Sequence, residues 1–304
     1  MPNTFSRRNL VAAVPLGLAG AVAGMASPAL AARPRNGSGQ SRTVPSDPAA
    51  RARMRARIIG STAEETTWIF YRLNIYGFAG GSLIPFFTMN HLSVNQWKPI
   101  AADQFATRTF ECGVYCRFDT DEPLEYWDNP ITGERRKVWQ FLGGPFNVTI
   151  GADGIATRGA ELAPKTLRME ALGGMVVVPT AASMLRPNLI DPAKWPKLYS
   201  GPKVYWESQA TYAATQDQAF DESLAAADSF CHFQNMGSWH PWLGMGAAEG
   251  RTYGNSHGAK LRSLDGIPLA ARRTLEQYTP QIFDTASWTK PRMDIPEYLA
   301  NPQP

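Results

Sequence analysis

The sequence predicts a mainly β protein with minor helical content, built as an antiparallel β-barrel or β-sandwich. Short runs rich in β-branched and aromatic residues recur along the chain, and such residues favour strands. Turns containing glycine or proline separate these runs at close spacing, which is typical of barrels and sandwiches rather than of βαβ units. Among barrels, we expect a lipocalin-like arrangement with a few peripheral helices.

The expected strands begin at residue 66. Residues 66–77 combine aromatic and β-branched side chains and end at a glycine cluster, and the turn segments 129–133 and 151–154 connect neighbouring strands. The expected strands are 66–77, 83–92, 108–118, 124–128, 135–141, 147–150, 155–157, 174–179 and 204–212. The expected helices are 48–59, 217–228 and 269–277.

Residues 1–31 are typical of a twin-arginine signal peptide. Arg7 and Arg8 precede an apolar stretch rich in Ala, Gly and Leu, and residues 29–31 form a small-x-small cleavage site. This stretch is too short to span the ~30 Å of hydrocarbon in a bilayer, although a membrane anchor is the alternative. We therefore expect passage through the twin-arginine translocase, cleavage, and a soluble periplasmic protein without stable membrane insertion.

Residues 32–48 have the composition of a disordered linker, and residues 49–304 that of a single β-rich domain. The linker is rich in Pro, Gly, Ser and Arg. The formal net charge of +4 is concentrated between residues 32 and 57, where seven arginines face only Asp47. Because alternate arginines spread around a helix rather than form one stripe, we expect a solvated linker and helix and no nucleic-acid partner.

Three cysteines raise the question of a disulfide. Cys112 and Cys116 lie four residues apart in an expected strand, which separates them by ~13 Å. Bridged residues have Cα atoms within ~7 Å, so these two cannot pair with each other. Either one can pair with Cys231, or all three are small buried hydrophobic residues.

Two pairs of segments resemble a known family. Residues 113–119 and 127–134 (GVYCRFD and WDNPITGE) resemble the G-x-Y-x-D … W-x-N-P-x-T-G-E pattern of the domain of unknown function 1838 family. Residues 239–246 and 258–261 (WHPWLGMG and GAKL) resemble its W-x-P-W-x-x-M-G and G-x-K segments. The resemblance covers most of the chain after Glu64. It implies an exported, β-rich protein directed at small molecules, and it transfers no catalytic residue.

Four histidines occur, and two of them lie in one aromatic segment. His232 and His240 belong to residues 230–242, where aromatic and polar side chains alternate densely. Pro241 biases His240 towards an extended conformation, which would hold its imidazole in one direction. We expect a proton-transfer role here. The alternative is that the tryptophans plug a barrel end and the histidines make structural hydrogen bonds. His91 and His257 are expected to tolerate substitution.

Glu111 and Glu207 lie among aromatic residues in expected strands. Period two places Tyr205, Glu207 and Gln209 on one face of residues 204–212. If this face points into a barrel, burial would raise the pKa of Glu207 and suit it to acid-base catalysis. If it points outward, these residues are ordinary surface.

The resulting hypothesis is an enzyme of lyase, isomerase or hydrolase type that acts on a small lipophilic or aromatic molecule in a barrel cavity. The candidate catalytic residues are His240, His232 and Glu207. The candidate binding residues are Tyr205, Trp206, Trp239, Trp242, Asn235 and Trp127. No cofactor or metal is expected, because HxH, HExxH and CxxC spacings are absent from the sequence. The alternative is a non-catalytic periplasmic carrier of a small lipophilic ligand.

The export signal is tested directly. Residues 1–35, fused to a reporter that fluoresces only after export in the folded state, are expected to deliver it to the periplasm. Replacing the arginine pair (Arg7→Lys with Arg8→Lys) should abolish delivery. Fluorescence microscopy measures the outcome, and unchanged delivery by the double variant would refute the assignment.

Overall fold

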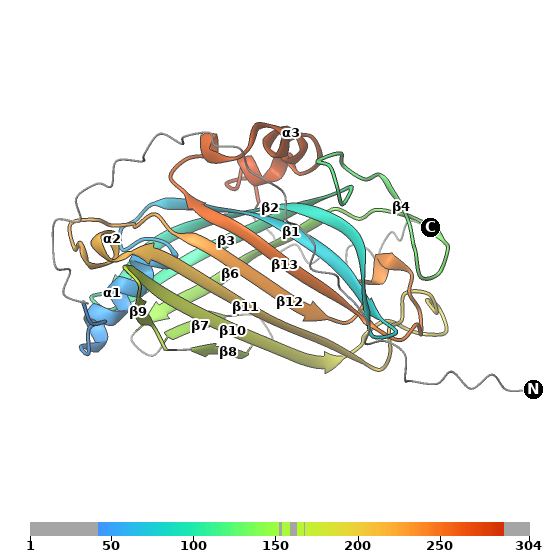
Figure 1. The fold of residues 1–304 in the computed structure, drawn as a ribbon, viewed down its shortest axis with the longest axis horizontal. Helices are drawn as coiled ribbons and strands as arrows, with labels where there is room; N and C mark the ends of the chain where they lie inside the picture. The colour runs from blue at the N-terminus through green and yellow to red at the C-terminus, as the bar shows by residue number, and fades with distance from the viewer. Residues whose placement is uncertain (1–41, 152–153, 159–162, 167, 289–304) are drawn as a thin grey trace, which may run out of the picture. The chain divides into compact units, whose positions relative to one another are not determined.

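The computed structural model describes residues 42–151, 154–158, 163–166 and 168–288. The expected signal peptide and most of the expected linker lie outside this part of the chain. The dominant element is an 11-stranded antiparallel sheet that curves into a half-barrel (Figure 1). Its strands are β1 (Thr66–Ala79), β2 (Ser82–Ala101), β3 (Gln104–Cys116), β6 (Phe141–Gly151), β7 (Gly154–Arg158), β8 (Ala163–Thr166), β9 (Glu170–Leu172), β10 (Met175–Pro187), β11 (Lys203–Thr215), β12 (Phe230–Gly237) and β13 (Arg251–Leu261).

Most neighbouring strands in the sheet follow one another along the chain, and one pairing joins strands that are far apart in the sequence. Neighbours in the order β7-β6-β3-β2-β1-β13-β12-β11-β10-β8 are close in sequence, except that β1 pairs with β13. β9 pairs with β10 beside this path. The edge strands β7 and β8 are separated by only four residues, and they contact each other. The mainly β prediction is therefore confirmed, in its barrel form rather than as a sandwich.

Alternation along each strand separates an inner face from an outer face. On β1, Tyr71 and Leu73 point inward, whereas Phe70 points to the outer layer. Helix α3 (Leu269–Tyr278) covers the outer face of β2 and β3, packing Ala271 and Leu275 against their apolar side chains. Figure 1 shows α3 above these strands. Helix α3 thus covers part of the outer face, whereas the inner face surrounds the interior of the half-barrel.

Helix α1 (Pro48–Ile59) packs at one end of the half-barrel. Its N-terminus is capped by the side chain of Asp47, which accepts a hydrogen bond from the Ala50 amide at 2.7 Å. Arg55 and Arg57 are each 4% exposed. The Arg55 side chain donates to the Gly151 carbonyl at 2.9 Å, and that of Arg57 donates to two carbonyls at 2.8 and 2.9 Å. The expectation of a solvated basic helix is therefore wrong for these two arginines, because α1 is packed into the fold.

Lys260 fixes the C-terminal end of α1 to the sheet. This residue lies on the inner face of β13, is 7% exposed, and donates from Nζ to the carbonyls of Arg57 and Gly60 at 2.7 Å each. The last carbonyls of a helix have no partner within the helix. The Lys260 side chain donates to two carbonyls at this end, and the Arg57 carbonyl also accepts from the Ala227 amide at 3.0 Å.

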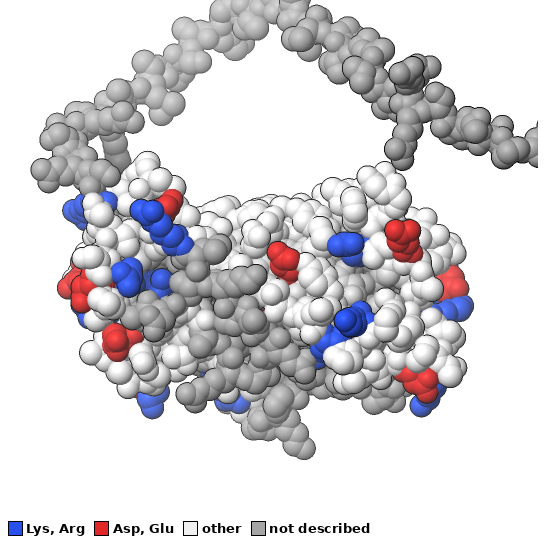
Figure 2. Space-filling model, turned by 90° about the horizontal axis from the view of Figure 1, so that it is seen from below, with Lys and Arg blue, Asp and Glu red and all other residues white. Residues whose placement is uncertain are grey.

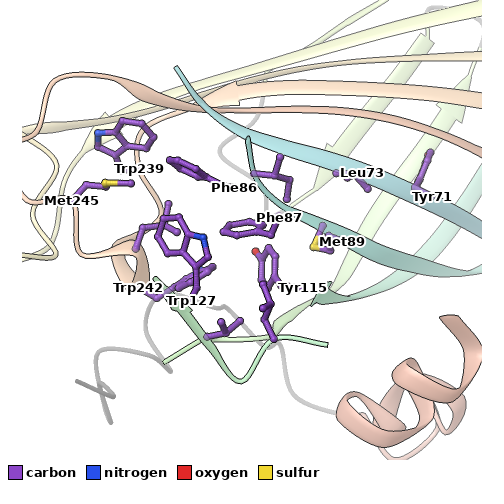
Figure 3. Packing of buried hydrophobic residues seen from close by; sticks show 14 of the residues in the cluster. Tyr71, Leu73, Phe86, Phe87, Met89, Tyr115, Trp127, Trp239, Trp242 and Met245 are labelled. Carbon is purple, nitrogen blue, oxygen red and sulfur yellow. The ribbon is translucent and has the colours of Figure 1, made fainter. Parts of the chain in front are cut away.

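A cluster of aromatic residues closes the other end. Phe87 stacks on Trp242 with ring centroids 5.5 Å apart, and Trp127 lies 4.8 Å from Phe86. Figure 3 shows this cluster and its continuation through Met89 and Leu73 to Tyr71. The small sheet of β4 (Tyr126–Asp128) and β5 (Arg135–Lys137) and the 3-10 helix η1 (Pro241–Leu243) carry part of it. We call the group formed by Phe86, Phe87, Trp127, Trp239 and Trp242 the aromatic plug.

The remaining helices are short. Helix α2 (Gln216–Phe220) ends well before the expected residue 228, and the 3-10 helices η2 (Leu264–Gly266) and η3 (Pro280–Phe283) flank α3. Within the described residues, no helix has both the length and the apolar character needed to cross a membrane. On the face in Figure 2, lysines and arginines lie interspersed with acidic residues rather than in one patch.

The anchoring of α1 is tested by Lys260→Met. This change removes the Nζ donor from both carbonyls. Among the described residues it leaves the Gly60 carbonyl without a donor, whereas the Arg57 carbonyl keeps the Ala227 amide. The free energy of unfolding should therefore fall by about 1–3 kcal/mol. Thermal unfolding followed by circular dichroism measures the effect. The matched control is Arg262→Gln, which removes an exposed ion pair with Asp228 and should change the Tm much less. Equal Tm changes in the two variants would contradict the anchor.

Candidate functional site

The inner face of the half-barrel encloses a cavity of about 650 Å³. Its walls come from β1, β2, β3, β6, β7 and β10 to β13, and Ile59 of α1 contributes at one end. A cavity of this size suits a small organic molecule. Apolar and aromatic side chains make up most of the wall, and polar side chains from β2, β3 and β10 to β13 are distributed among them.

Glu111 is the acidic side chain that lines this cavity. It lies on the inner face of β3, where the Ser93 hydroxyl of β2 donates to its Oε1 at 3.4 Å. Burial raises the pKa of the Glu111 carboxyl from 4.5 to about 7, and the Ser93 hydrogen bond opposes this only in part. At neutral pH both the protonated and the ionised forms of Glu111 are therefore populated.

His91 lies on the inner face of β2 between two aromatic rings. Phe141 stacks on it at 5.8 Å, and Tyr71 packs on its other side at 5.6 Å. Phe141 reaches it across Gly113, which pairs with both residues and has no side chain in between. Burial lowers the pKa of His91 to about 4, so the imidazole is neutral at pH 7. Its Nδ1 atom is buried and has no hydrogen-bond partner among the described residues.

Two tyrosine hydroxyls meet across the inner face. Oη of Tyr71 on β1 and Oη of Tyr212 on β11 are 3.3 Å apart. Two strands separate them, and these carry Gly258 and Cys231 at the intervening positions. A Cβ atom at Gly258 would lie 2.9 Å from the Tyr71 ring and 2.0 Å from a backbone oxygen. The contact between the tyrosines thus depends on small residues between them.

The tyrosines and Glu111 act on each other electrostatically. Burial raises the pKa of Tyr71 and of Tyr212, and the charge of Glu111 raises both further. Both phenols are therefore protonated at neutral pH and can donate hydrogen bonds. The cavity thus combines a carboxyl group that exchanges protons near pH 7, two neutral hydroxyl donors and a neutral imidazole.

Further polar atoms in the cavity wall lack partners. Nδ2 of Asn95, Oγ1 of Thr107 and Oγ1 of Thr252 are buried without a hydrogen bond to any described residue. Oδ1 of Asn95 is satisfied by Thr109 at 2.9 Å, which leaves the amide nitrogen as the free group. Buried polar groups normally have partners, so these atoms mark positions for ligand or water.

Three of the residues predicted from the sequence line the cavity. His240, Trp206 and Asn235 belong to its wall. Burial lowers the pKa of His240 to about 4, with no charged partner contributing. His240 precedes η1 and has the extended backbone expected of a residue before proline. His240 lies at the end of the cavity next to the aromatic plug, whereas Glu111 lies closer to α1.

The structure places Glu207, Tyr205 and His232 on the outer face, so the outward alternative describes Tyr205 and Glu207, and His232 does not reach the cavity. Glu207 is exposed, and the Tyr205 hydroxyl donates to its carboxylate on the outer surface. The inward residues of β11 are instead Trp206, Ser208 and Ala210. On β12 the inward positions are Phe233 and Asn235, so His232 lies on the outer face opposite His257. The period-two grouping of Tyr205 with Glu207 is confirmed, and that face points outward, whereas residues 230–237 were not expected to form a strand.

Trp127, Trp239 and Trp242 belong to the aromatic plug rather than to the cavity wall. Figure 3 shows them packed around Phe86 and Phe87. The indole of Trp239 donates to the Ala248 carbonyl at 2.9 Å. The alternative in which tryptophans close one barrel end therefore describes their arrangement, and their predicted direct contact with ligand has no support in the geometry.

The motif W-x-N-P-x-T-G-E holds this plug in place. The Asn129 side chain accepts from the amides of Ile131 and Thr132 and donates to the Leu243 carbonyl at 3.0 Å. It also contacts the sulfur of Met245. Because Leu243 and Met245 belong to the second family segment, the two motifs form one structural unit. Their residues hold the plug at this end of the barrel, and His240 of the second segment also lines the cavity.

All three cysteines are buried and free. Cys112 and Cys116 lie in the outer layer under α3, whereas Cys231 lies on the inner face. The disulfide alternative is thus not observed, and the alternative of small buried residues describes them. Burial raises the pKa of each thiol to about 12, so none is a thiolate nucleophile at neutral pH. In the described part of the chain, no three His, Cys, Asp or Glu side chains are grouped to hold a metal ion.

The fold and the cavity define an antiparallel half-barrel protein with an enclosed site of small-molecule size. The chain belongs to the family described as protein of unknown function (DUF1838), whose model matches residues 64–296. No curated protein matches it. The family resemblance found in the sequence is thereby confirmed.

The buried state of Glu111 is tested through the pH dependence of stability. Its folded-state pKa lies above the unfolded value, so protonation stabilises the fold at low pH, and this contribution is lost as the pH rises from 4.5 through 7. Relative to the wild type, Glu111→Gln should therefore gain on the order of 2 kcal/mol between pH 5 and pH 8.

Urea unfolding at the two pH values measures this difference. Both proteins retain His91 and His240, so their titration cancels in the comparison. The exposed Glu207→Gln is the control and should follow the wild type at both pH values. A Glu111→Gln curve parallel to the wild type would contradict the assignment.

Proposed function

We propose that the protein is an enzyme that transfers a proton on a small lipophilic or aromatic compound bound inside the half-barrel. The observation that carries this proposal is the Glu111 carboxyl, which lines the cavity with a pKa of about 7. Acid-base catalysis is most effective when the pKa of the catalytic group lies near the working pH. Glu111 can therefore take a proton from the substrate and return it.

The neighbouring groups support the same role. His91 is neutral, held between Phe141 and Tyr71, and has an unpaired Nδ1, so it can position a polar group of the ligand. The reaction belongs to the lyase, isomerase or hydrolase type and uses this chain's own side chains without a cofactor. The proposal thus keeps a histidine and a carboxylate, as inferred from the sequence, with His91 in place of His240 or His232 and Glu111 in place of Glu207.

A second candidate function is a carrier that holds such a molecule without converting it. The mainly apolar wall and the unpaired polar atoms of Asn95, Thr107 and Thr252 favour ligand binding as such. Both functions need the cavity, and only the enzyme needs the proton-exchanging carboxyl.

We also propose that the chain acts in the periplasm as a soluble protein after export by the twin-arginine translocase. The support is the arginine pair Arg7 and Arg8 with the apolar stretch and small-residue site that follow. Its partner in the cavity is a small molecule, and no nucleic-acid partner is proposed.

Glu111→Gln separates the enzyme from the carrier. A panel of lipophilic and aromatic compounds is first screened for displacement of 1-anilinonaphthalene-8-sulfonate from the purified protein, and the binders are then followed for conversion by mass spectrometry. We expect Glu111→Gln to bind the same compounds while conversion falls by ~10²-fold or more.

Two variants accompany this test. Glu207→Gln alters a carboxyl on the outer face and should leave conversion unchanged. His240→Asn changes the histidine favoured by the sequence, and a loss equal to that of Glu111→Gln would move the proton-transfer role to it. Binding without conversion by the wild type would establish the carrier instead.

A further inference from the structure

The hydroxyl pair of Tyr71 and Tyr212 presents a hydrogen-bond donor to the cavity. Their oxygens are 3.3 Å apart, and either hydroxyl can donate to the other. Each hydroxyl carries one proton, so the acceptor of that bond keeps its own proton for a third group. Both tyrosines line the cavity, which makes a ligand oxygen the natural third partner.

The side chains around Tyr71 and Tyr212 determine which kind of ligand oxygen can bind to their hydroxyls. Phe233 packs 6.0 Å from the Tyr71 ring, and Leu73 and Met89 line the same part of the wall. These side chains suit an apolar ring. Glu111 lies near the pair on the inner face, because it pairs with Ser93 on β2 and Ser93 pairs with Ile69, two residues before Tyr71 on β1. An ionised Glu111 would therefore repel an anionic group placed at the hydroxyls. A neutral carbonyl oxygen carries no such penalty.

On the basis of the proposed function, we infer that Tyr71 and Tyr212 bind the carbonyl oxygen of an uncharged aromatic or alicyclic ketone, and that Glu111 transfers the proton of its α-carbon. Ionised Glu111 takes this proton, the electrons of the C–H bond form a C=C bond, and the carbonyl π electrons move to oxygen. The hydroxyl pair stabilises the charge that develops there. Return of the proton to another carbon of a conjugated enolate gives an isomer and regenerates Glu111, with no co-reactant consumed.

Binding of the oxygen is tested with two matched probes. 2-Naphthol has the shape and the oxygen of a cyclic enolate, and naphthalene has the same ring system without oxygen. The double variant Tyr71→Phe with Tyr212→Phe keeps both rings, and it removes both partners of the hydrogen bond together, which limits its effect on folding. Fluorescence titration should show 2-naphthol binding weakened about 10-fold or more in this variant, with naphthalene binding unchanged.

Proton transfer is tested with 2-tetralone in D₂O, where nuclear magnetic resonance follows deuterium entering the α-carbons. The wild type and Glu207→Gln should accelerate exchange equally. Glu111→Gln should lose the acceleration by ~10²-fold, and the double phenylalanine variant should lose most of it while its melting temperature stays near that of the wild type.

The outcomes separate this inference from the proposed function. Equal affinity of the wild type and the double variant for 2-naphthol, or no binding of 2-naphthol at all, overturns the oxygen site and leaves the role of Glu111 to the conversion assay. Weakened 2-naphthol binding with exchange unaffected by Glu111→Gln keeps the oxygen site and overturns proton transfer by Glu111.

Discussion

The pairing of β1 with β13 is the contact on which the rest of the structure depends. It joins two strands from opposite ends of the domain, in register from Trp68 with Leu261 to Phe78 with Arg251. Without it the sheet would divide into one part that ends at β1 and another that ends at β13. The same pairing sets Tyr71 opposite Gly258, and so within reach of Tyr212 on β11. The strand pairing that joins the two parts of the sheet therefore also sets the geometry of the site.

The structures at the two ends of the half-barrel also bear on the electrostatics, because they shield part of the inner face from water. At one end Lys260 holds α1, and at the other Asn129 holds the aromatic plug. Burial then favours the uncharged form of each enclosed group, which raises the pKa of Glu111 and lowers that of His91. The end structures thus act on the proposed chemistry from a distance, by controlling the medium in which Glu111 titrates.

Runs of β-branched and aromatic residues with closely spaced turns were sufficient to predict the class of fold, and helix α1 was predicted with its observed bounds. The limits of prediction are physical. Period two shows that Tyr205 and Glu207 share a face, but the choice of inward face depends on partner strands distant in sequence. β12 and β13 were missed because residues such as Gln234, Asn235 and Gly254 weaken the usual strand composition. Glu111 could have been favoured earlier, since it alternates with Thr107 and Thr109 on one face of its strand.

Glu111, His91 and the two tyrosines come together only through strand pairing, which could not be predicted from the sequence. The family motifs nevertheless carry information about this site through their glycines. Gly113 stands in the G-x-Y segment, where a Cβ atom would meet the Met89 side chain at 2.4 Å. Gly258 stands in the G-x-K segment, where a Cβ atom would meet Tyr71. These glycines make room for Met89 and Tyr71 in the cavity wall, so the motifs mark the site by the absence of side chains at these two positions. A search of the motifs for reactive side chains alone does not detect the role of these glycines.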